Sequence, residues 1–387
     1  MNLFCNRFLR PLILLTFLSC ISLGIPCEAK KKHRHKKVPS YHSLQDFKGL
    51  DPYVDQPLWM KQQIASDLEG LKPADISSTT YDQFLKSYAE AGHHLLLVRY
   101  VIKKQVLSIH SLLSPEEERM DGVSTRLDWM NKAMEQLTKT TLLPDVDFIV
   151  SLHDSLDINL PVPIFVFAKN PKISPSNILI PDFEALRGHE VSLYDQANKI
   201  YPWSKKNNLC FFRGSLTGPS EALQGNFLEI PRVKAVTFSH RYPNLIDARI
   251  TCGHCKEQKA KYPDYFGSSV TLVGHWPYKY QLLVDGNSCA YSRAYWQLFS
   301  NCVIIKQISD NIQWYYGALK PFEHYIPVNN DLSDLIQKMQ WAHEHDEESQ
   351  QISQRAQTFA KENLTHYRVM QYLHQVLVEY ANIQSSQ

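Results

Sequence analysis

Two acidic residues stand directly after apolar runs that we expect to be buried strands. Asp154 comes soon after Val146–Leu152, and Asp285 follows Tyr280–Val284. A carboxylate at the carboxyl end of a parallel strand faces the crevice in which open α/β sheets bind their ligands. Asp154 in that position could act as a general base that takes a proton from a hydroxyl, and the alternative is a helix cap or turn residue.

The second of these strands opens a βαβ unit that runs from Tyr278 to Lys306. The turn formers Asp285, Gly286 and Asn287 end the strand, and an apolar stripe then predicts a helix before the next strand. Free N–H groups at the helix start, with Arg293 about one turn further on, favour a diphosphate or nucleotide cradle. The alternative is an ordinary βαβ unit in which Asp-Gly-Asn only turns the chain.

A further candidate site follows the short strand Leu209–Phe212. Arg213, Gly214 and Ser215 bring a cation, a backbone that a ligand can approach closely and a hydroxyl to one point. This combination favours an anion site, whereas a surface turn with a solvated arginine is the alternative.

The composition is that of a globular protein with no overall preference for nucleic acid. The 387 residues are 44% hydrophobic, and 41 Lys+Arg stand against 39 Asp+Glu, which gives a net charge of only +2. A charge this small creates no field that would attract a polyanion. The length favours two domains over one.

The amino terminus has the pattern of a secretory signal. Arg7 and Arg10 precede an apolar run, Leu12–Ile25, and Ala29 ends a segment with small residues at the expected cleavage point. We predict a signal peptide over 1–29, or an uncleaved membrane anchor, and a basic flexible segment over 30–45. Lys30–Lys37 could make peripheral contact with anionic lipid. The predicted location is the periplasm or cell envelope of a bacterium, or the secretory lumen of a eukaryote.

One cysteine pair suggests a different class of function. Cys252-Gly253-His254-Cys255 has the residues of a disulfide-isomerase redox pair. The pair lacks the aromatic-proline-tryptophan approach after a strand that positions such thiols, so a local disulfide or idle thiols are favoured. Zinc is not expected, because the chain has no second Cys pair.

The remaining pattern predicts an α/β chain with two Rossmann-like domains that face one cleft. We expect an acceptor-side domain over 46–195, a donor-binding domain over 196–350, and a carboxyl-terminal helix and tail over 351–387 that pack across both. The expected elements are helices within Tyr41–Ser87, a hairpin in Leu95–Ile109, a helix over Arg126–Leu142, a strand over Pro163–Ala168, a helix and then a loop over Arg232–Ile250, a helix over Leu332–Ala342 and one long helix over Ile352–Ile383.

Taken together, these stretches resemble glycosyltransferase family 90, the group of capsule-associated and lipopolysaccharide-modifying proteins and Rumi-type protein O-glucosyltransferases. The resemblance is collinear over roughly residues 90 to 335. Its pieces are LPDVDFIVSLHD ending at Asp154, PVPIFVFAKN, YPWSKKNNLCFFRGS, the stretch from Tyr278 to Ile305, and LKPFEHYIPVNNDLSDL from Leu319.

The resemblance implies a GT-B-like fold and an inverting O-glycosyltransferase. It would move a sugar of the glucose or xylose class from a UDP-sugar to a hydroxyl of a glycan, lipopolysaccharide or protein. The resemblance makes Asp154 the base, lets Arg213 and Arg293 neutralise the leaving diphosphate, and needs no metal or other cofactor. The other donor-binding residues would be Gly214, Ser215, Asp285, Gly286, Asn287 and Ser292. The alternatives are a glycan-binding protein that keeps the fold without turnover, and a thiol–disulfide protein that uses Cys252 and Cys255.

Overall fold

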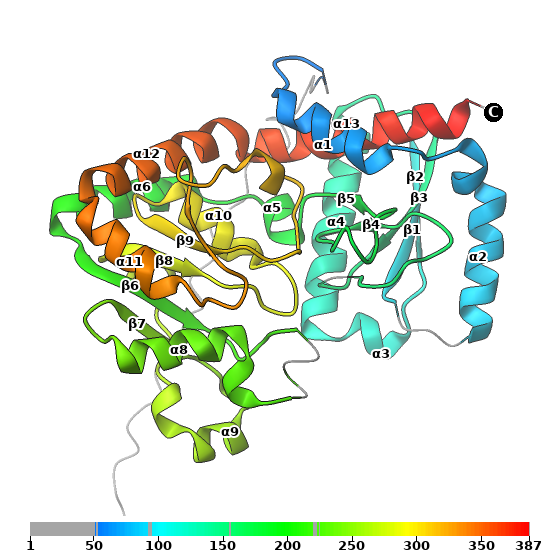
Figure 1. Cartoon of the computed structure of the whole chain (residues 1–387). Helices are drawn as coiled ribbons and strands as arrows, with labels where there is room; N and C mark the ends of the chain where they lie inside the picture. Colours follow the sequence, from blue (N-terminus) through cyan, green and yellow to red (C-terminus); the bar gives the residue numbers. More distant parts are fainter. Residues whose placement is uncertain are drawn as a thin grey trace, which may run out of the picture. The chain divides into compact units, whose positions relative to one another are not determined.

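Two five-stranded sheets and the helices around them make up the part of the chain that the structure describes (Figure 1). The structure is a computed structural model, and it describes residues 51–386 except 52, 92–94, 155, 220–222 and 224. The predicted signal peptide, the basic segment and the lipid contact of Lys30–Lys37 lie outside the described residues. Among the described helices, none combines the length and the apolar character needed to cross a bilayer.

The first sheet is mixed and has the order β2-β1-β3-β4-β5. The predicted hairpin is confirmed as an antiparallel pair, and β3, β4 and β5 run parallel. The strands are β1 (Leu97–Lys103), β2 (Val106–Ser111), β3 (Val146–Ser151), β4 (Phe165–Val166) and β5 (Ile178–Leu179). The helices of this half are α1 (Leu58–Leu68), α2 (Ser78–Ala91), α3 (Pro115–Glu118), α4 (Asp121–Thr140), α5 (Phe183–Arg187) and α6 (Val191–Ile200).

The second sheet is parallel throughout and has the order β10-β9-β8-β6-β7. Its elements are β6 (Asn207–Gly214), α8 (Pro231–Arg241), β7 (Ile246–Ile250), α9 (Lys256–Lys261), β8 (Tyr278–Leu283), α10 (Tyr291–Phe299), β9 (Val303–Gln307), β10 (Ile326–Val328) and α11 (Leu335–Glu344). From β6 the chain adds β7 on one side and then β8 on the other. The carboxyl ends of β6 and β8 therefore meet at a topological switch point, where sheets of this type bind ligands.

The strand β7 corrects the sequence analysis, which expected a loop after the helix at Arg232. Ile246, Ala248 and Ile250 are buried, while Asp247 and Arg249 between them are partly exposed. β7 is an edge strand, so one of its faces reaches solvent and two charged residues interrupt its short apolar pattern. That alternation is typical of a half-buried strand, although it spans only five residues.

The carboxyl-terminal segment packs on both halves as two helices, not the single helix that the sequence predicted. Helix α12 (Asp346–Asn363) contacts α10 and β9, and α13 (His366–Ser385) contacts α5 and β3. The chain breaks at Leu364, and the Thr365 hydroxyl accepts a hydrogen bond from the Arg368 N–H to begin α13. The predicted α/β fold with two lobes and a carboxyl-terminal crossing element is confirmed.

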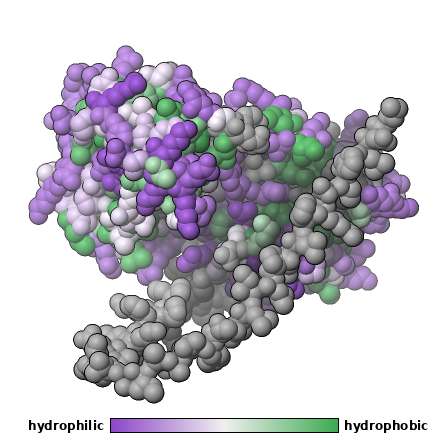
Figure 2. All heavy atoms as spheres, turned by 90° about the horizontal axis from the view of Figure 1, so that it is seen from below, coloured by the Kyte–Doolittle hydropathy of each residue, from purple (hydrophilic) through white to green (hydrophobic). Residues whose placement is uncertain are grey.

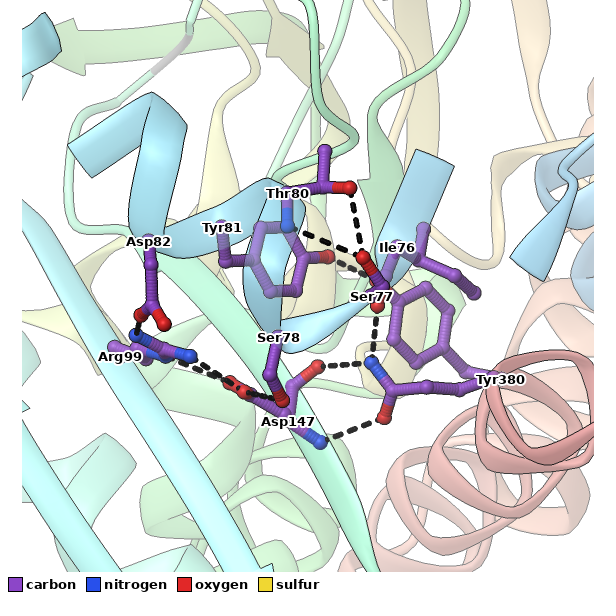
Figure 3. A network of polar contacts seen from close by, with 10 residues as sticks. Ile76, Ser77, Ser78, Thr80, Tyr81, Asp82, Arg99, Asp147 and Tyr380 are labelled. Atoms are coloured by element: carbon purple, nitrogen blue, oxygen red, sulfur yellow. Dashed lines mark hydrogen bonds and ion pairs between the residues drawn. The ribbon is translucent and has the colours of Figure 1, made fainter. Parts of the chain in front are cut away.

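A partly buried polar network fixes α13 against the first sheet (Figure 3). The Gln384 side chain accepts from the Asp147 N–H at 2.9 Å and donates to the Asp147 carbonyl at 2.9 Å. The Asp147 carboxylate accepts from Arg99 Nε at 2.8 Å and from the Ser78 hydroxyl at 2.6 Å. Residues from α2, β1, β3 and α13 thus satisfy one another, which holds in place the strand that leads to Asp154.

Candidate active site

A cavity of about 340 Å³ lies between the two lobes at the switch point. Seven of the nine predicted site residues line it: Asp154, Gly214, Ser215, Gly286, Asn287, Ser292 and Arg293. Phe183 and Glu184 close it from the first lobe, and Thr217 and Arg232 from the second. The residues that the sequence placed at the ends of different strands therefore face one space.

Asp154 is held in this cavity by partners from both lobes. Its carboxylate forms an ion pair with Arg126 of α4 and accepts from Asn287 Nδ2 at 3.1 Å. Its main-chain carbonyl accepts from the Ser288 hydroxyl at 3.0 Å and from the Tyr291 hydroxyl. The side chain keeps 30% of its surface exposed, so one side of the carboxylate remains open to a substrate.

Arg293 is a half-buried cation, and it forms no ion pair with a carboxylate of the described residues. Its guanidinium packs over the Phe212 and Trp296 rings and donates one hydrogen bond, to the Arg213 carbonyl. The other terminal nitrogen, NH1, is buried and has no partner in the described part of the chain. Burial and the nearby Arg232 lower the pKa of Arg293 to about 9. A bound anion would oppose this shift, because an opposite charge stabilises the protonated guanidinium.

Arg232 of α8 is a second such cation, and the sequence analysis missed it. Its guanidinium donates to the Thr217 hydroxyl at 2.6 Å, to the Ser215 carbonyl at 3.1 Å and to the Asp285 carbonyl at 3.0 Å. Burial lowers the pKa of Arg232 to about 10. Arg232 therefore joins the loops after β6 and β8, and it places a second positive charge on the cavity wall.

Arg213, which the sequence analysis placed on the leaving diphosphate, points elsewhere. Its guanidinium packs over the Phe211 ring and forms an ion pair with Asp247 of β7 at 2.9 Å, and the residue does not line the cavity. Successive side chains of a strand point to opposite faces of the sheet, so the Arg213 side chain lies on the same face as that of Phe211. The backbone of the next residue, Gly214, lines the cavity. The structure thus brings Arg232, not Arg213, to the cavity with Arg293.

Gly286 gives a first testable prediction about this arrangement. A Cβ at position 286 would lie 2.9 Å from Arg232 NH2 and 2.9 Å from the Thr217 hydroxyl oxygen. Gly286→Ala should therefore displace the Arg232 guanidinium and weaken binding of an anionic ligand by about tenfold or more. Calorimetric titration with UDP measures this effect. Gly253→Ala, where a Cβ would meet nothing within 4 Å, is the matched control and should bind as the wild type does.

Asp285 lies in a neighbouring and larger cavity of about 1050 Å³, which shares Asn287 with the first. Its lining mixes apolar residues with amide and hydroxyl side chains, which include Asn170, Gln307, Ser309, Asn329 and Asn330. The Asp285 carboxylate accepts a hydrogen bond from the Ser309 hydroxyl, and the main-chain N–H of Asp285 donates to Gln307 Oε1 at 2.9 Å. Burial raises the pKa of Asp285, and the Lys306 charge and the Ser309 hydrogen bond oppose that rise.

Glu184 is a second carboxylic acid on the wall of the smaller cavity, and it too was missed from sequence. It lies in the first turn of α5, and its Oε2 atom is buried without a hydrogen-bond partner among the described residues. Burial, and then the charge of Asp182, raise the pKa of Glu184 to about 7. The group therefore changes charge near neutral pH.

This shift predicts a pH dependence of stability. Between the ordinary pKa of 4.5 and about 7, the folded chain keeps a proton at Glu184 that the unfolded chain has lost. The free energy of unfolding should therefore fall as pH rises through this window. Glu184→Gln should remove that part of the slope. The difference in free energy of unfolding between Glu184→Gln and wild type should therefore shift in favour of the variant by about 1–3 kcal/mol from pH 5 to pH 8.

Urea unfolding of both proteins at pH 5 and pH 8 measures the difference. Glu135→Gln is the control, since Glu135 is exposed and pairs with Lys139 along α4. The same pH slope in wild type and Glu184→Gln would show that Glu184 titrates normally.

The comparisons with known proteins agree on one family. The family model for glycosyl transferase family 90 matches residues 61–387. Protein O-glucosyltransferase 3 of Homo sapiens is 33% identical over 266 residues, which cover 65% of this chain and 49% of that protein. Protein O-glucosyltransferase 2 of Danio rerio is 27% identical over 357 residues, which cover 86% of this chain and 66% of that protein. The chain thus spans about half to two thirds of these relatives.

Among solved structures, Anabaena Alr3699/HepE in complex with UDP-glucose aligns with a TM-score of 0.37 and 8% sequence identity. The alignment covers 70% of this chain and 71% of that chain. At that TM-score the likeness adds nothing to the fold described above.

Proposed function

Since the chain belongs to glycosyl transferase family 90, we propose that it transfers a sugar of the glucose or xylose class from a UDP-sugar to a hydroxyl group. Its relatives are named protein O-glucosyltransferases, which favours a polypeptide as the acceptor over a glycan or a lipopolysaccharide. The transfer inverts the configuration at the anomeric carbon.

The observation that carries this proposal is the pair of arginines at the switch point, of which Arg232 is buried and Arg293 is half-buried. Burial lowers the pKa of both arginines, the charge of Arg232 lowers the pKa of Arg293 further, and neither forms an ion pair with a carboxylate of the described residues. Two desolvated guanidinium groups are costly unless an anion compensates them. The diphosphate of a nucleotide sugar is such an anion, and arginine forks match its oxygens.

The donor would lie with its diphosphate against Arg232, Arg293 and the N–H groups at the start of α10. Gly214 and Gly286 have no side chain, so the donor can approach the protein backbone closely there. Ser215 offers a hydroxyl, and so does Ser292 in the first turn of α10. The larger cavity, lined by amide and hydroxyl groups around Asp285, would take the hydroxyl-rich part of the substrates.

Asp154 would take the proton of the acceptor hydroxyl. The freed oxygen attacks the anomeric carbon from the face opposite the diphosphate, the bond from carbon to the diphosphate oxygen breaks, and UDP leaves with its negative charge held by the two arginines. Arg126 positions the carboxylate, and Asn287 must yield its hydrogen bond to the acceptor.

These fixed cations would do the work for which other enzymes use a divalent metal, so we expect activity in the presence of a chelator. Within the described residues, one group of three potential metal ligands occurs, Cys252, His254 and Cys255, and none of these residues lines either cavity.

The test is to offer the full chain a panel of UDP-sugars with EDTA present and to measure UDP release with and without a polypeptide acceptor. Consumption of one donor supports transfer. Binding of a UDP-sugar without any consumption would instead support the glycan-binding alternative, and the absence of both would reject the proposal.

A further inference from the structure

We propose that the Cys252–Cys255 disulfide is exchange-active and oxidises paired thiols of a polypeptide, as a second activity separate from sugar transfer. The two cysteines are bonded to each other, with Cα atoms 5.6 Å apart. The other described cysteines, Cys210, Cys289 and Cys302, are free and buried. Only this pair thus combines a disulfide with a place near the surface, among the cysteines that the structure describes.

The pair occupies the connection between a strand and a helix. It follows β7, with only Thr251 between Ile250 and Cys252, and it directly precedes α9. A redox role was discounted from the sequence because the pair lacks the aromatic-proline-tryptophan approach after a strand; β7 supplies a strand, although not that approach. Figure 2 views the molecule from the side on which α9 lies in Figure 1, and the surface it shows there is mainly hydrophilic.

The two sulfurs differ in their access to solvent. Cys252 is partly exposed and the two residues after it, Gly253 and His254, are exposed, whereas Cys255 is buried at 9% exposure. A Cβ at Gly253 would meet nothing within 4 Å, so space is open beside the exposed sulfur. An incoming thiolate can therefore reach Cys252 while Cys255 stays shielded, which separates an attacked sulfur from a leaving sulfur.

The charges around the pair favour a leaving thiolate. His254 lies between the cysteines, and α9 carries Lys256, Lys259 and Lys261 with one acidic residue, Glu257. Neighbouring cations stabilise a thiolate relative to a thiol. By contrast, burial raises the pKa of the Cys210 and Cys289 thiols, which makes those cysteines poor at exchange.

A purely structural role explains the bond less well. A disulfide stabilises a protein mainly by closing a loop in the unfolded chain, and a loop this short gives only about 2 kcal/mol. The backbone on either side is held without the bond, because the Thr251 N–H donates to the Gly214 carbonyl at 2.7 Å and the Lys259 N–H to the Cys255 carbonyl at 3.0 Å. Reduction should therefore leave the local fold intact.

The reaction balances without a cofactor. A thiolate of the dithiol attacks Cys252 Sγ, the bond to Cys255 Sγ breaks, and Cys255 leaves as a thiolate that takes up a proton. The second thiol of the partner, once deprotonated, attacks its own mixed-disulfide sulfur and releases Cys252. Two electrons and two protons pass to the chain, and the partner gains an internal disulfide.

The test uses the full chain and a synthetic peptide with two cysteines. With excess reduced peptide at pH 7.5, wild type should lose the Cys252–Cys255 bond and yield oxidised peptide. Given the oxidised peptide, Cys255→Ser should form a mixed disulfide through Cys252 about tenfold or more faster than Cys252→Ser forms one through Cys255. Cys302→Ala, which changes a buried free cysteine, is the control and should exchange as wild type does.

Two results would overturn the proposal. The first is that the Cys252–Cys255 disulfide of wild type stays oxidised in excess reduced peptide. The second is that Cys255→Ser and Cys252→Ser form mixed disulfides with the oxidised peptide at equal, slow rates. Neither result bears on UDP release, which is measured separately, so this proposal and the glycosyl transfer can fail independently.

Discussion

Replacing Asp154 by asparagine should lower the rate of sugar transfer by about two to four orders of magnitude. Asparagine has nearly the same shape and still accepts a hydrogen bond, but it cannot take the proton of the acceptor hydroxyl. The diphosphate contacts lie on the other lobe, so the dissociation constant for UDP should stay within about twofold of the wild-type value. Initial rates of UDP release with an acceptor, together with UDP titration, measure both quantities.

The matched control for this variant is Asp128→Asn on α4. Asp128 is exposed and pairs with Lys132, on the same helix that supplies Arg126 to Asp154. Its change should leave transfer unaltered. Normal transfer by Asp154→Asn would show that another group is the base, and Glu184, the other carboxylic acid on the cavity wall, would then be the first to examine.

Arg293→Met should remove about half or more of the stabilisation that UDP gives to the protein. In wild type, UDP at a hundred times its dissociation constant should raise the free energy of unfolding by about 2.7 kcal/mol. A charged hydrogen bond to phosphate contributes about 1.5–3 kcal/mol, so its loss should weaken UDP binding about tenfold to a hundredfold. Thermal melting with and without UDP measures the change.

The same variant should melt no earlier than wild type when UDP is absent. Methionine can fill the space beside Phe212 and Trp296, and it removes a half-buried charge whose pKa is lowered to about 9. Arg241→Met, at the exposed end of the helix that carries Arg232, is the control and should respond to UDP as wild type does. An unchanged UDP response in Arg293→Met would remove this arginine from the site.

The sequence revealed those parts of the site that local patterns encode. A buried parallel strand is an apolar run, and turn formers mark its end, so Asp154 and the Asp285–Asn287 turn could be placed at strand ends without coordinates. The βαβ unit, the hairpin and the two-lobed fold followed from the same periodicities. The structure brings Asp154 and Asn287, 133 residues apart, within hydrogen-bond distance.

The parts that sequence missed depend on how separate elements pack. Arg232 begins a helix of its own and enters the cavity only because α8 covers the sheet beside β7, and no motif surrounds it. The raised pKa of Glu184 comes from burial and from Asp182, neither of which is visible in a residue string. The side chain of Arg213 lies on the face of β6 that turns it toward Asp247, with which it forms an ion pair. Its neighbour Gly214 lines the site.

Proton NMR of the glucose released when the full chain hydrolyses UDP-glucose, recorded before the anomers equilibrate, tests the central claim without knowledge of the acceptor. With Asp154 activating the attacking oxygen opposite a diphosphate held by Arg232 and Arg293, the first product from this α-linked donor should be β-glucose, and EDTA should not slow its formation. Release of α-glucose first would contradict the single displacement, and failure to bind or consume any UDP-sugar would contradict the assignment of the site.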